Sequence, residues 1–156
     1  MTKYLNNPIL ILIFRLIVGF IFLSFGASKI AITDKFASEI GNYGLMPVFT
    51  LNLIALFLPW LELIVGILLI LGVRLRTSAM ISTVLLLMFI GAVAFAMIMG
   101  LDINCGCSST NPQKVGLPKI AENAGLSILS IIIFAFPNSK IGLESFFTKN
   151  LNGNLN

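Results

Sequence analysis

Apolar residues run along most of this chain in long blocks, and polar residues interrupt these blocks at only a few places. Four blocks reach, or nearly reach, the roughly 20 residues that an α-helix needs to cross the hydrocarbon core of a membrane. They cover about Pro8 to Ser28, Thr50 to Gly72, Ser78 to Gly100 and Lys119 to Phe136. The pattern therefore predicts an all-α fold, a four-helix transmembrane bundle.

The connection between the first two blocks predicts a shorter helix, from about Asp34 to Gly41. Apolar side chains share one face of this helix, and we expect Lys35, Ser38 and Glu39 on the opposite, polar face. A helix of this kind lies in the plane of the membrane interface. We expect it to close one end of the bundle.

The composition supports an integral membrane protein, because 58% of the residues are hydrophobic and only 10% are charged. The length suits one domain. We expect the four-span bundle to occupy residues 1–137 and a polar, cytoplasmic tail to occupy residues 138–156. The net charge of +4 comes from basic residues scattered between the apolar blocks, so no nucleic-acid partner is expected.

The basic residues instead indicate how the chain is oriented in the membrane. The shortest connection between two blocks carries Arg74 and Arg76 and no acidic residue, which favours a cytoplasmic location. Four spans then place both chain termini in the cytoplasm as well. We expect a multi-pass protein of the inner (plasma) membrane, with the connection between the third and fourth spans outside the cytoplasm.

That outer connection contains Cys105 and Cys107, which are the chain's only two cysteines and are separated by one glycine. Gly106 allows the backbone to bend enough for the two sulfurs to form a disulfide. A ring this small is strained, and strained disulfides are typical of labile or catalytic sites. The pattern favours a redox-active pair over a structural disulfide or two idle thiols. An extracytoplasmic location agrees with this, because disulfides persist there.

The absence of histidine excludes several classes of site. Catalysis by Ser-His-Asp or Cys-His pairs is excluded, and so are haem or metal centres with histidine ligands. Two thiolates do not complete a tetrahedral zinc site, so no metal is expected. Proton transfer falls to carboxylates, lysines, tyrosines or the thiols themselves.

Glu62 is the most informative charged residue inside a predicted span, because acids within membranes are costly and commonly functional. Arg15 is the obvious partner for it, but the counted depths place the two at different levels, so we expect Glu62 to be unpaired. We expect Glu62 to pass protons to a membrane quinone bound beside Trp60. Asn123, one turn into the fourth span, is a second candidate for a quinone contact, and the alternative is a hydrogen bond to another helix. Taken alone, Trp60 is expected to pack against lipid or in the core.

With these residues in order, the chain resembles the DoxX-like family of membrane proteins, within it the branch that contains the methylamine-utilisation protein MauE. The residues that carry the resemblance are the run 14–19, Gly26, Lys29, Pro59, Glu62, Gly66, Gly72, the Cys105-Gly106-Cys107 triplet and Asn123. The resemblance implies a four-helix membrane bundle that is linked to thiol–disulfide traffic outside the cytoplasm. It also implies a thioredoxin-like protein partner, with quinone-coupled oxidation in some relatives.

These observations lead to a membrane thiol–disulfide oxidoreductase as the predicted function. Cys105 and Cys107 are the predicted catalytic pair, with Glu62 as proton carrier and Trp60 and Asn123 as quinone contacts. The alternative is a non-enzymatic assembly or stability subunit of a membrane complex, in which the cysteines only hold the outer connection together. A transporter of small solutes has only Glu62 and Arg15 in its favour.

Overall fold

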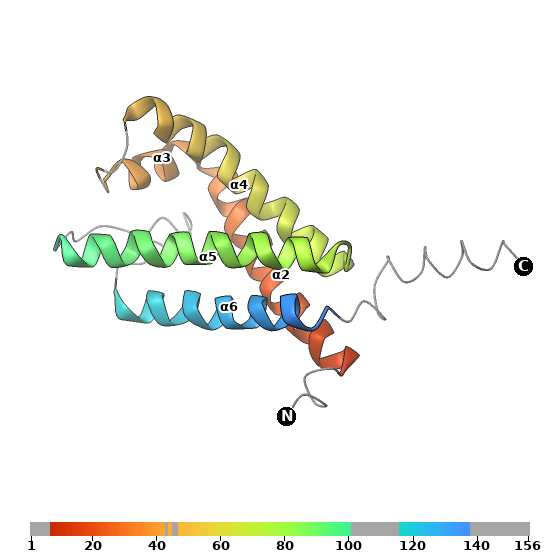
Figure 1. Ribbon diagram of the computed structural model, residues 1–156. Helices are drawn as coiled ribbons and strands as arrows, with labels where there is room; N and C mark the ends of the chain where they lie inside the picture. Colours follow the sequence, from red (N-terminus) through yellow and green to blue (C-terminus); the bar gives the residue numbers. More distant parts are fainter. Residues whose placement is uncertain (1–6, 43, 45–46, 101–115, 138–156) are drawn as a thin grey trace, which may run out of the picture.

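The computed structural model describes residues 7–42, 44, 47–100 and 116–137 (Figure 1). These residues form five α-helices, and no strand occurs among them. The helices are α2 (Pro8–Ala31), α3 (Thr33–Gly41), α4 (Val48–Leu71), α5 (Leu75–Ile98) and α6 (Leu117–Ala135). Four of them, α2, α4, α5 and α6, are long and apolar enough to cross a membrane. The predicted all-α, four-span architecture is confirmed.

The helix ends follow from local sequence signals. Asn7 precedes α2, and its side-chain oxygen accepts a hydrogen bond of 3.1 Å from the backbone N–H of Ile9. At the other end α2 continues past Ser28 to Ala31, which brings Lys29 into the helix. A short turn joins α4 to α5, and Gly72 takes a left-handed conformation there with φ of 72°.

The spans form two closely packed pairs, α2 with α4 and α5 with α6. Glycines allow α2 and α4 to approach until their backbones touch. A Cβ atom on Gly66 would lie 2.9 Å from the carbonyl oxygen of Gly19, and one on Gly26 would lie 2.8 Å from that of Pro59. Both positions therefore need glycine, as is usual where membrane helices pack tightly.

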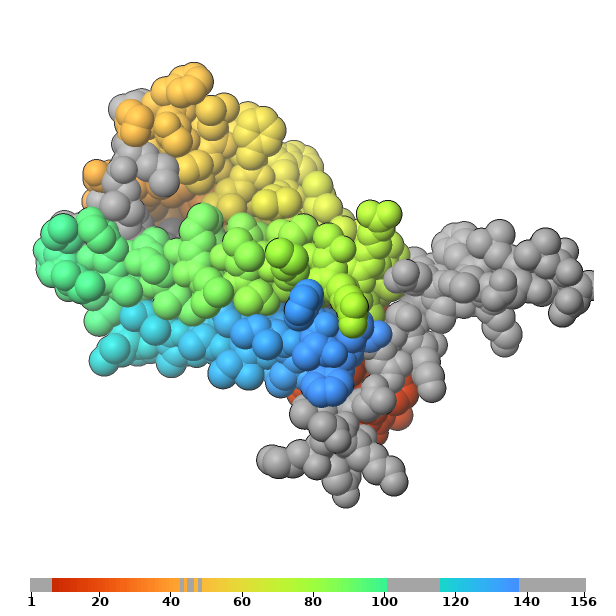
Figure 2. Space-filling view, viewed as in Figure 1, coloured from red at the N-terminus to blue at the C-terminus, as the bar shows by residue number. Residues whose placement is uncertain are grey.

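In the second pair, α5 and α6 lie side by side along their lengths (Figures 1 and 2). Small hydroxyl side chains are buried on both helices, namely Ser78, Ser82, Ser127 and Ser130. At Gly91 and Gly125 an added Cβ would meet no other atom of the described residues within 4 Å. They do not contribute to the packing between the helices that the structure describes.

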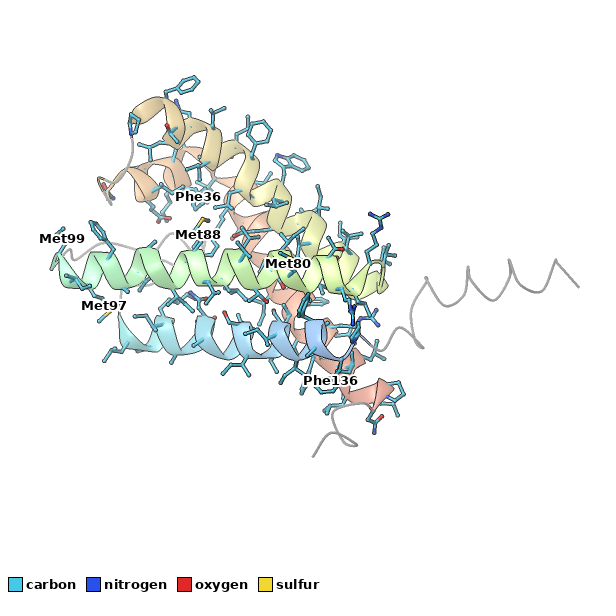
Figure 3. All side chains as sticks on the ribbon, viewed as in Figure 1. Phe36, Met80, Met88, Met97, Met99 and Phe136 are labelled. Atoms are coloured by element: carbon cyan, nitrogen blue, oxygen red, sulfur yellow. The ribbon has the colours of Figure 1, made fainter. Side chains whose placement is uncertain are left out.

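The predicted interfacial helix is present as α3 and packs mainly on α4 (Figure 1). It lies at one end of the bundle, here called the α3 end, where α2 and α5 finish and α4 and α6 begin. Phe36 is on the side of α3 that faces the other helices and is 1% exposed (Figure 3). The prediction for Glu39 is wrong. It lies one turn after Phe36 on the same face and is only 4% exposed.

Large apolar side chains cover the outside of the spans, including Phe20, Phe49, Phe57 and Ile98. A water-soluble protein rarely exposes so continuous an apolar surface. In a bilayer these side chains contact lipid, and the polar groups are confined to the interior and the ends. The protein is therefore surrounded by lipid.

Candidate functional site: a buried ion pair in the bundle

A lysine and a glutamate form an ion pair in the interior of the bundle. Lys29 Nζ, from α2, donates a hydrogen bond of 2.6 Å to Glu62 Oε1, from α4. The Lys29 side chain is 0% exposed and that of Glu62 is 2% exposed. An ion pair without water needs precise geometry, because each charge has lost its hydration. Removing either partner leaves the other as an uncompensated buried charge.

The two side chains meet because α2 and α4 run in opposite directions. Side chains lean towards the N-terminus of their own helix. Lys29 is near the end of α2 and leans back into the bundle, whereas Glu62 leans towards the α3 end. Their levels differ along the bundle axis, and the long lysine side chain spans the difference.

The expectation that Glu62 is unpaired is therefore wrong. The predicted first span stopped at Ser28, which assigned Lys29 to the outer connection. The real helix runs one turn further, and this turn places Lys29 inside the bundle. The expectation that Arg15 does not pair with Glu62 agrees with the hydrogen bonds that Arg15 makes elsewhere.

Two aromatic rings complete the surroundings of the ammonium group. Lys29 Nζ lies 4.9 Å from the centre of the Phe36 ring and 4.4 Å from that of Phe89. Both distances fit cation–π contacts, which strengthen when water is excluded. Phe36 comes from α3 and Phe89 from α5. The ion pair and these two rings therefore bring together residues of four helices, α2, α3, α4 and α5.

A small cavity of about 10 Å³ adjoins the ion pair, bordered by Asn123 and by phenylalanines of α2 and α5. Glu62 Oε2 and Asn123 Nδ2 are buried, and neither has a hydrogen-bond partner among the residues that the structure describes. A space of this size is about the least that holds one water molecule, which needs polar partners. Asn123 can donate to such a water, and the water can donate to Glu62.

A second buried lysine lies near a phenylalanine that lines the cavity. Lys119 is 4% exposed, donates a hydrogen bond of 2.8 Å to Glu122 Oε2, and lies 5.0 Å from the centre of the Phe25 ring. Phe25 also borders the cavity. The α3 end therefore contains two lysines that are held between carboxylates and phenylalanine rings.

Arg15 serves a different part of the fold. It lies at the opposite end of the bundle, where its Nε and Nη2 donate hydrogen bonds of 2.9 and 3.2 Å to the carbonyl oxygens of Leu69 and Ile70. These carbonyls belong to the last turn of α4, where no further helical N–H is available. The side chain is buried and completes the end of α4 rather than extending to the membrane surface.

The structure does not bring all of the predicted site residues together. Glu62 and Asn123 border the same cavity. Trp60 is 52% exposed on the outer surface of α4, whereas Glu62, two positions later, points inward. Cys105 and Cys107 lie outside the described residues, and so does the predicted polar tail.

The arrangement suits proton exchange within an enclosed polar cluster. A carboxylate and an ammonium group in direct contact can share and pass protons, and a neighbouring water can extend their reach. Within the described ranges, no three potential metal ligands from histidine, cysteine, aspartate and glutamate come together. The cavity also has no room for a quinone ring.

Sequence reasoning missed three buried charged residues, Lys29, Lys119 and Glu39. Lys29 and Glu62 were both among the residues that carried the family resemblance, and that shared membership is the signal that could have suggested the pair. Lys119 lies beside Pro118 in the first turn of the fourth span. A lysine at the start of a span is more simply expected to be exposed, so nothing in the sequence indicated its burial.

Comparison with known proteins places the chain in a family. The sequence profile described as "Methylamine utilisation protein MauE" matches residues 7–136. The methylamine utilization protein MauE of Methylophilus methylotrophus is 28% identical over 153 residues, covering 95% of this chain and 80% of the relative. MauE of Paracoccus denitrificans is 26% identical over 135 residues, covering 85% and 73%.

No solved structure matches the chain. The wider DoxX-like grouping stays a prediction. The profile match runs from the start of α2 to the residue after α6, and so includes every helix of the bundle and all of the buried charged residues described above. The chain belongs to the MauE family of methylamine utilisation proteins.

Proposed function

We propose that this chain is a membrane thiol–disulfide exchange protein of methylamine utilisation, working on the extracytoplasmic side of the inner membrane. The observation that carries the proposal is the position of the only two cysteines. They are one residue apart on the connection between α5 and α6. Both helices that flank this connection reach the α3 end of the bundle.

The proposed orientation in the membrane is based on two basic residues at the end of the bundle opposite the α3 end. Arg74 and Arg76 lie at the short turn between α4 and α5, which is far from the α3 end. Basic residues in short connections stay preferentially in the cytoplasm. The α3 end, with the cysteine connection, then faces outward, where disulfides form and persist.

The chemistry is exchange with a thioredoxin-like protein. One thiolate of the Cys105 and Cys107 pair attacks a sulfur of the partner's disulfide, and the partner's other sulfur leaves as a thiolate. The second cysteine then attacks the mixed disulfide, forms the Cys105–Cys107 bond and releases the partner as a dithiol. Two electrons and two protons pass to the partner, and the reverse sequence returns them.

A membrane quinone, accepting two electrons and two protons, is a candidate for the second redox partner. The cavity beside Glu62 has no room for it, and Trp60 faces lipid, away from Glu62. A quinone would therefore bind from the lipid side of α4. No step of the exchange proposed here passes through it.

Trapping of the mixed disulfide tests the proposal. In the native host, either Cys105→Ser or Cys107→Ser leaves one thiol unable to complete the exchange, so a species of higher mass should appear on non-reducing gels. Reductant should collapse this species, and the double variant, which lacks both thiols, should not form it. Mass spectrometry of the trapped species identifies the partner.

Absence of any trapped species in both single variants would support the alternative, an assembly or stability subunit. In that case the disulfide should resist mild reductant and the level of a client complex should fall in the absence of the chain. A catalytic pair should instead equilibrate with the reductant.

A further inference from the structure

Buried polar atoms without partners are not scattered through this bundle. Among the described residues they are Glu39 Oε1 and Oε2, Glu62 Oε2, Asn123 Nδ2, Ser127 Oγ and Ser130 Oγ. In a membrane protein each such atom costs several kcal/mol unless water or another group satisfies it. Water would satisfy these atoms, and the cavity of about 10 Å³ beside Glu62 and Asn123 has room for one molecule.

These atoms follow one another from the α3 end towards the opposite end. Glu39 is at the α3 end and shares a helix face with Phe36, whose ring contacts the Lys29 ammonium group. Lys29 contacts Glu62, and Glu62 borders the cavity with Asn123. Positions 123, 127 and 130 share one face of α6, and the rise per residue spreads them over about 10 Å of depth.

Two further buried hydroxyls lie on the neighbouring helix, and each of them already donates to a backbone carbonyl oxygen. α5 runs antiparallel to α6 and buries Ser82 and Ser78. Counting by the helical rise, these serines lie about 10 and 5 Å from the start of α5, which matches the level of Ser130 near the end of α6. Ser78 Oγ donates to the carbonyl oxygen of Val73, in the turn between α4 and α5, at 3.4 Å.

We propose that these groups form a proton path across the membrane, running from Glu39 through Lys29, Glu62 and Asn123 to the serines between α5 and α6. Water molecules would connect these groups, and the species transferred along them is the proton. This goes beyond thiol–disulfide exchange, because it assigns the bundle interior an activity that does not need the cysteines.

The proton steps balance along the path. Protonated Glu39 gives its proton towards Lys29, and Lys29 passes one of its own ammonium protons to Glu62. Glu39 is then a carboxylate, Lys29 is again an ammonium group, and Glu62 is a carboxylic acid. Glu62 passes the proton to the water beside Asn123, and hydroxyls and waters carry it onward. Lys35, on α3, is the other charge near Glu39.

Proton uptake by liposomes tests the path. The full-length protein is reconstituted into liposomes that contain a trapped pH indicator, and a potassium gradient with valinomycin drives protons inward. Wild type should acidify the lumen faster than protein-free liposomes. Glu62→Gln and Glu39→Gln should fall to the protein-free rate, because each removes a titratable group of the path.

Matched variants separate conduction from folding. Ser127→Ala/Ser130→Ala removes only two hydroxyls, keeps both charges of the ion pair and should also reduce proton entry. Asp34→Asn, an exposed acid on the same helix as Glu39, should conduct like wild type. Cys105→Ser/Cys107→Ser should conduct like wild type as well, so failure of the redox proposal leaves this test intact. Wild-type liposomes no faster than protein-free ones would overturn the path and leave the waters a structural role.

Discussion

The guanidinium group of Arg15 lies directly against Gly72, the residue that ends α4, and occupies the space that a side chain at position 72 would need. The contact joins the N-terminal third of α2 to the end of α4, and the same guanidinium group donates to the carbonyl oxygens of Leu69 and Ile70. Glycine is therefore needed at position 72 for two reasons. The Arg15 side chain leaves no space for a Cβ atom, and the backbone has a positive φ of 72°.

Gly72→Ala should therefore destabilise the protein by more than the backbone strain alone, which is about 1–2 kcal/mol for a left-handed residue with a Cβ. Gly100→Ala is the matched control, because Gly100 has a similar φ of 67° and an added Cβ there would meet no described atom within 4 Å. Unfolding of the detergent-solubilised protein measures both. Equal losses in the two variants would contradict a steric role for Arg15.

Close approach of α2 and α4 should make Gly26 intolerant of substitution. Gly26→Ala places a methyl group 2.8 Å from the backbone oxygen of Pro59, which has no flexible side chain to move aside. Gly125→Ala, in open space on α6, should instead be neutral or stabilise by about 0.5–1 kcal/mol, since alanine favours helix. Thermal unfolding of both variants in detergent tests this. Similar effects at the two positions would argue against the packing described for α2 and α4.

The ion pair should show strong coupling in a double-mutant cycle. Lys29→Met leaves Glu62 as an unpaired buried charge and should cost on the order of 3–5 kcal/mol. Lys29→Met/Glu62→Met should recover most of that loss, because two apolar side chains of similar length replace the pair. Unfolding free energies of the two single variants and the double variant give the coupling. Additive losses would mean that the two residues act independently.

Glu39 should make stability depend on pH. Burial raises the pKa of this carboxyl above its ordinary value of 4.5, and the charges of Lys35 and Lys29 only partly oppose this. The folded state then binds more protons than the unfolded state between the two pKa values, so stability falls as the pH rises through that window. Glu39→Gln should remove this component, whereas Asp34→Asn should keep it. Melting temperatures across a pH series compare the three proteins.

The proposed orientation predicts which compartment the cysteines face. A membrane-impermeant thiol reagent should label reduced Cys105 or Cys107 in intact cells, while a cysteine introduced at Arg76 should be labelled only after the cells are opened. The opposite pattern would reverse the orientation and remove the extracytoplasmic exchange with it.

The sequence by itself determined the four spans and the interfacial helix. Long apolar blocks and a short amphipathic stretch are local properties of the sequence. In a membrane the backbone polar groups of such segments must be hydrogen-bonded internally, which favours the α-helix. The same reasoning reached the family, through residues spaced along the helices and the cysteine pair. It also singled out Glu62 and Asn123 as polar residues within the spans, because such residues are conspicuous in an apolar block.

Only the tertiary structure decided how those polar residues are combined. Whether Glu62 meets Arg15 or Lys29 depends on where α2 ends and on how α2 and α4 are aligned, and the alignment depends on contacts such as Gly19 with Gly66. One additional turn of α2 moved Lys29 from the expected surface to the core. Burial of Glu39 likewise depends on the packing of α3 against α4. These are relationships between segments that are distant in the sequence, and the periodicity within one segment does not predict them.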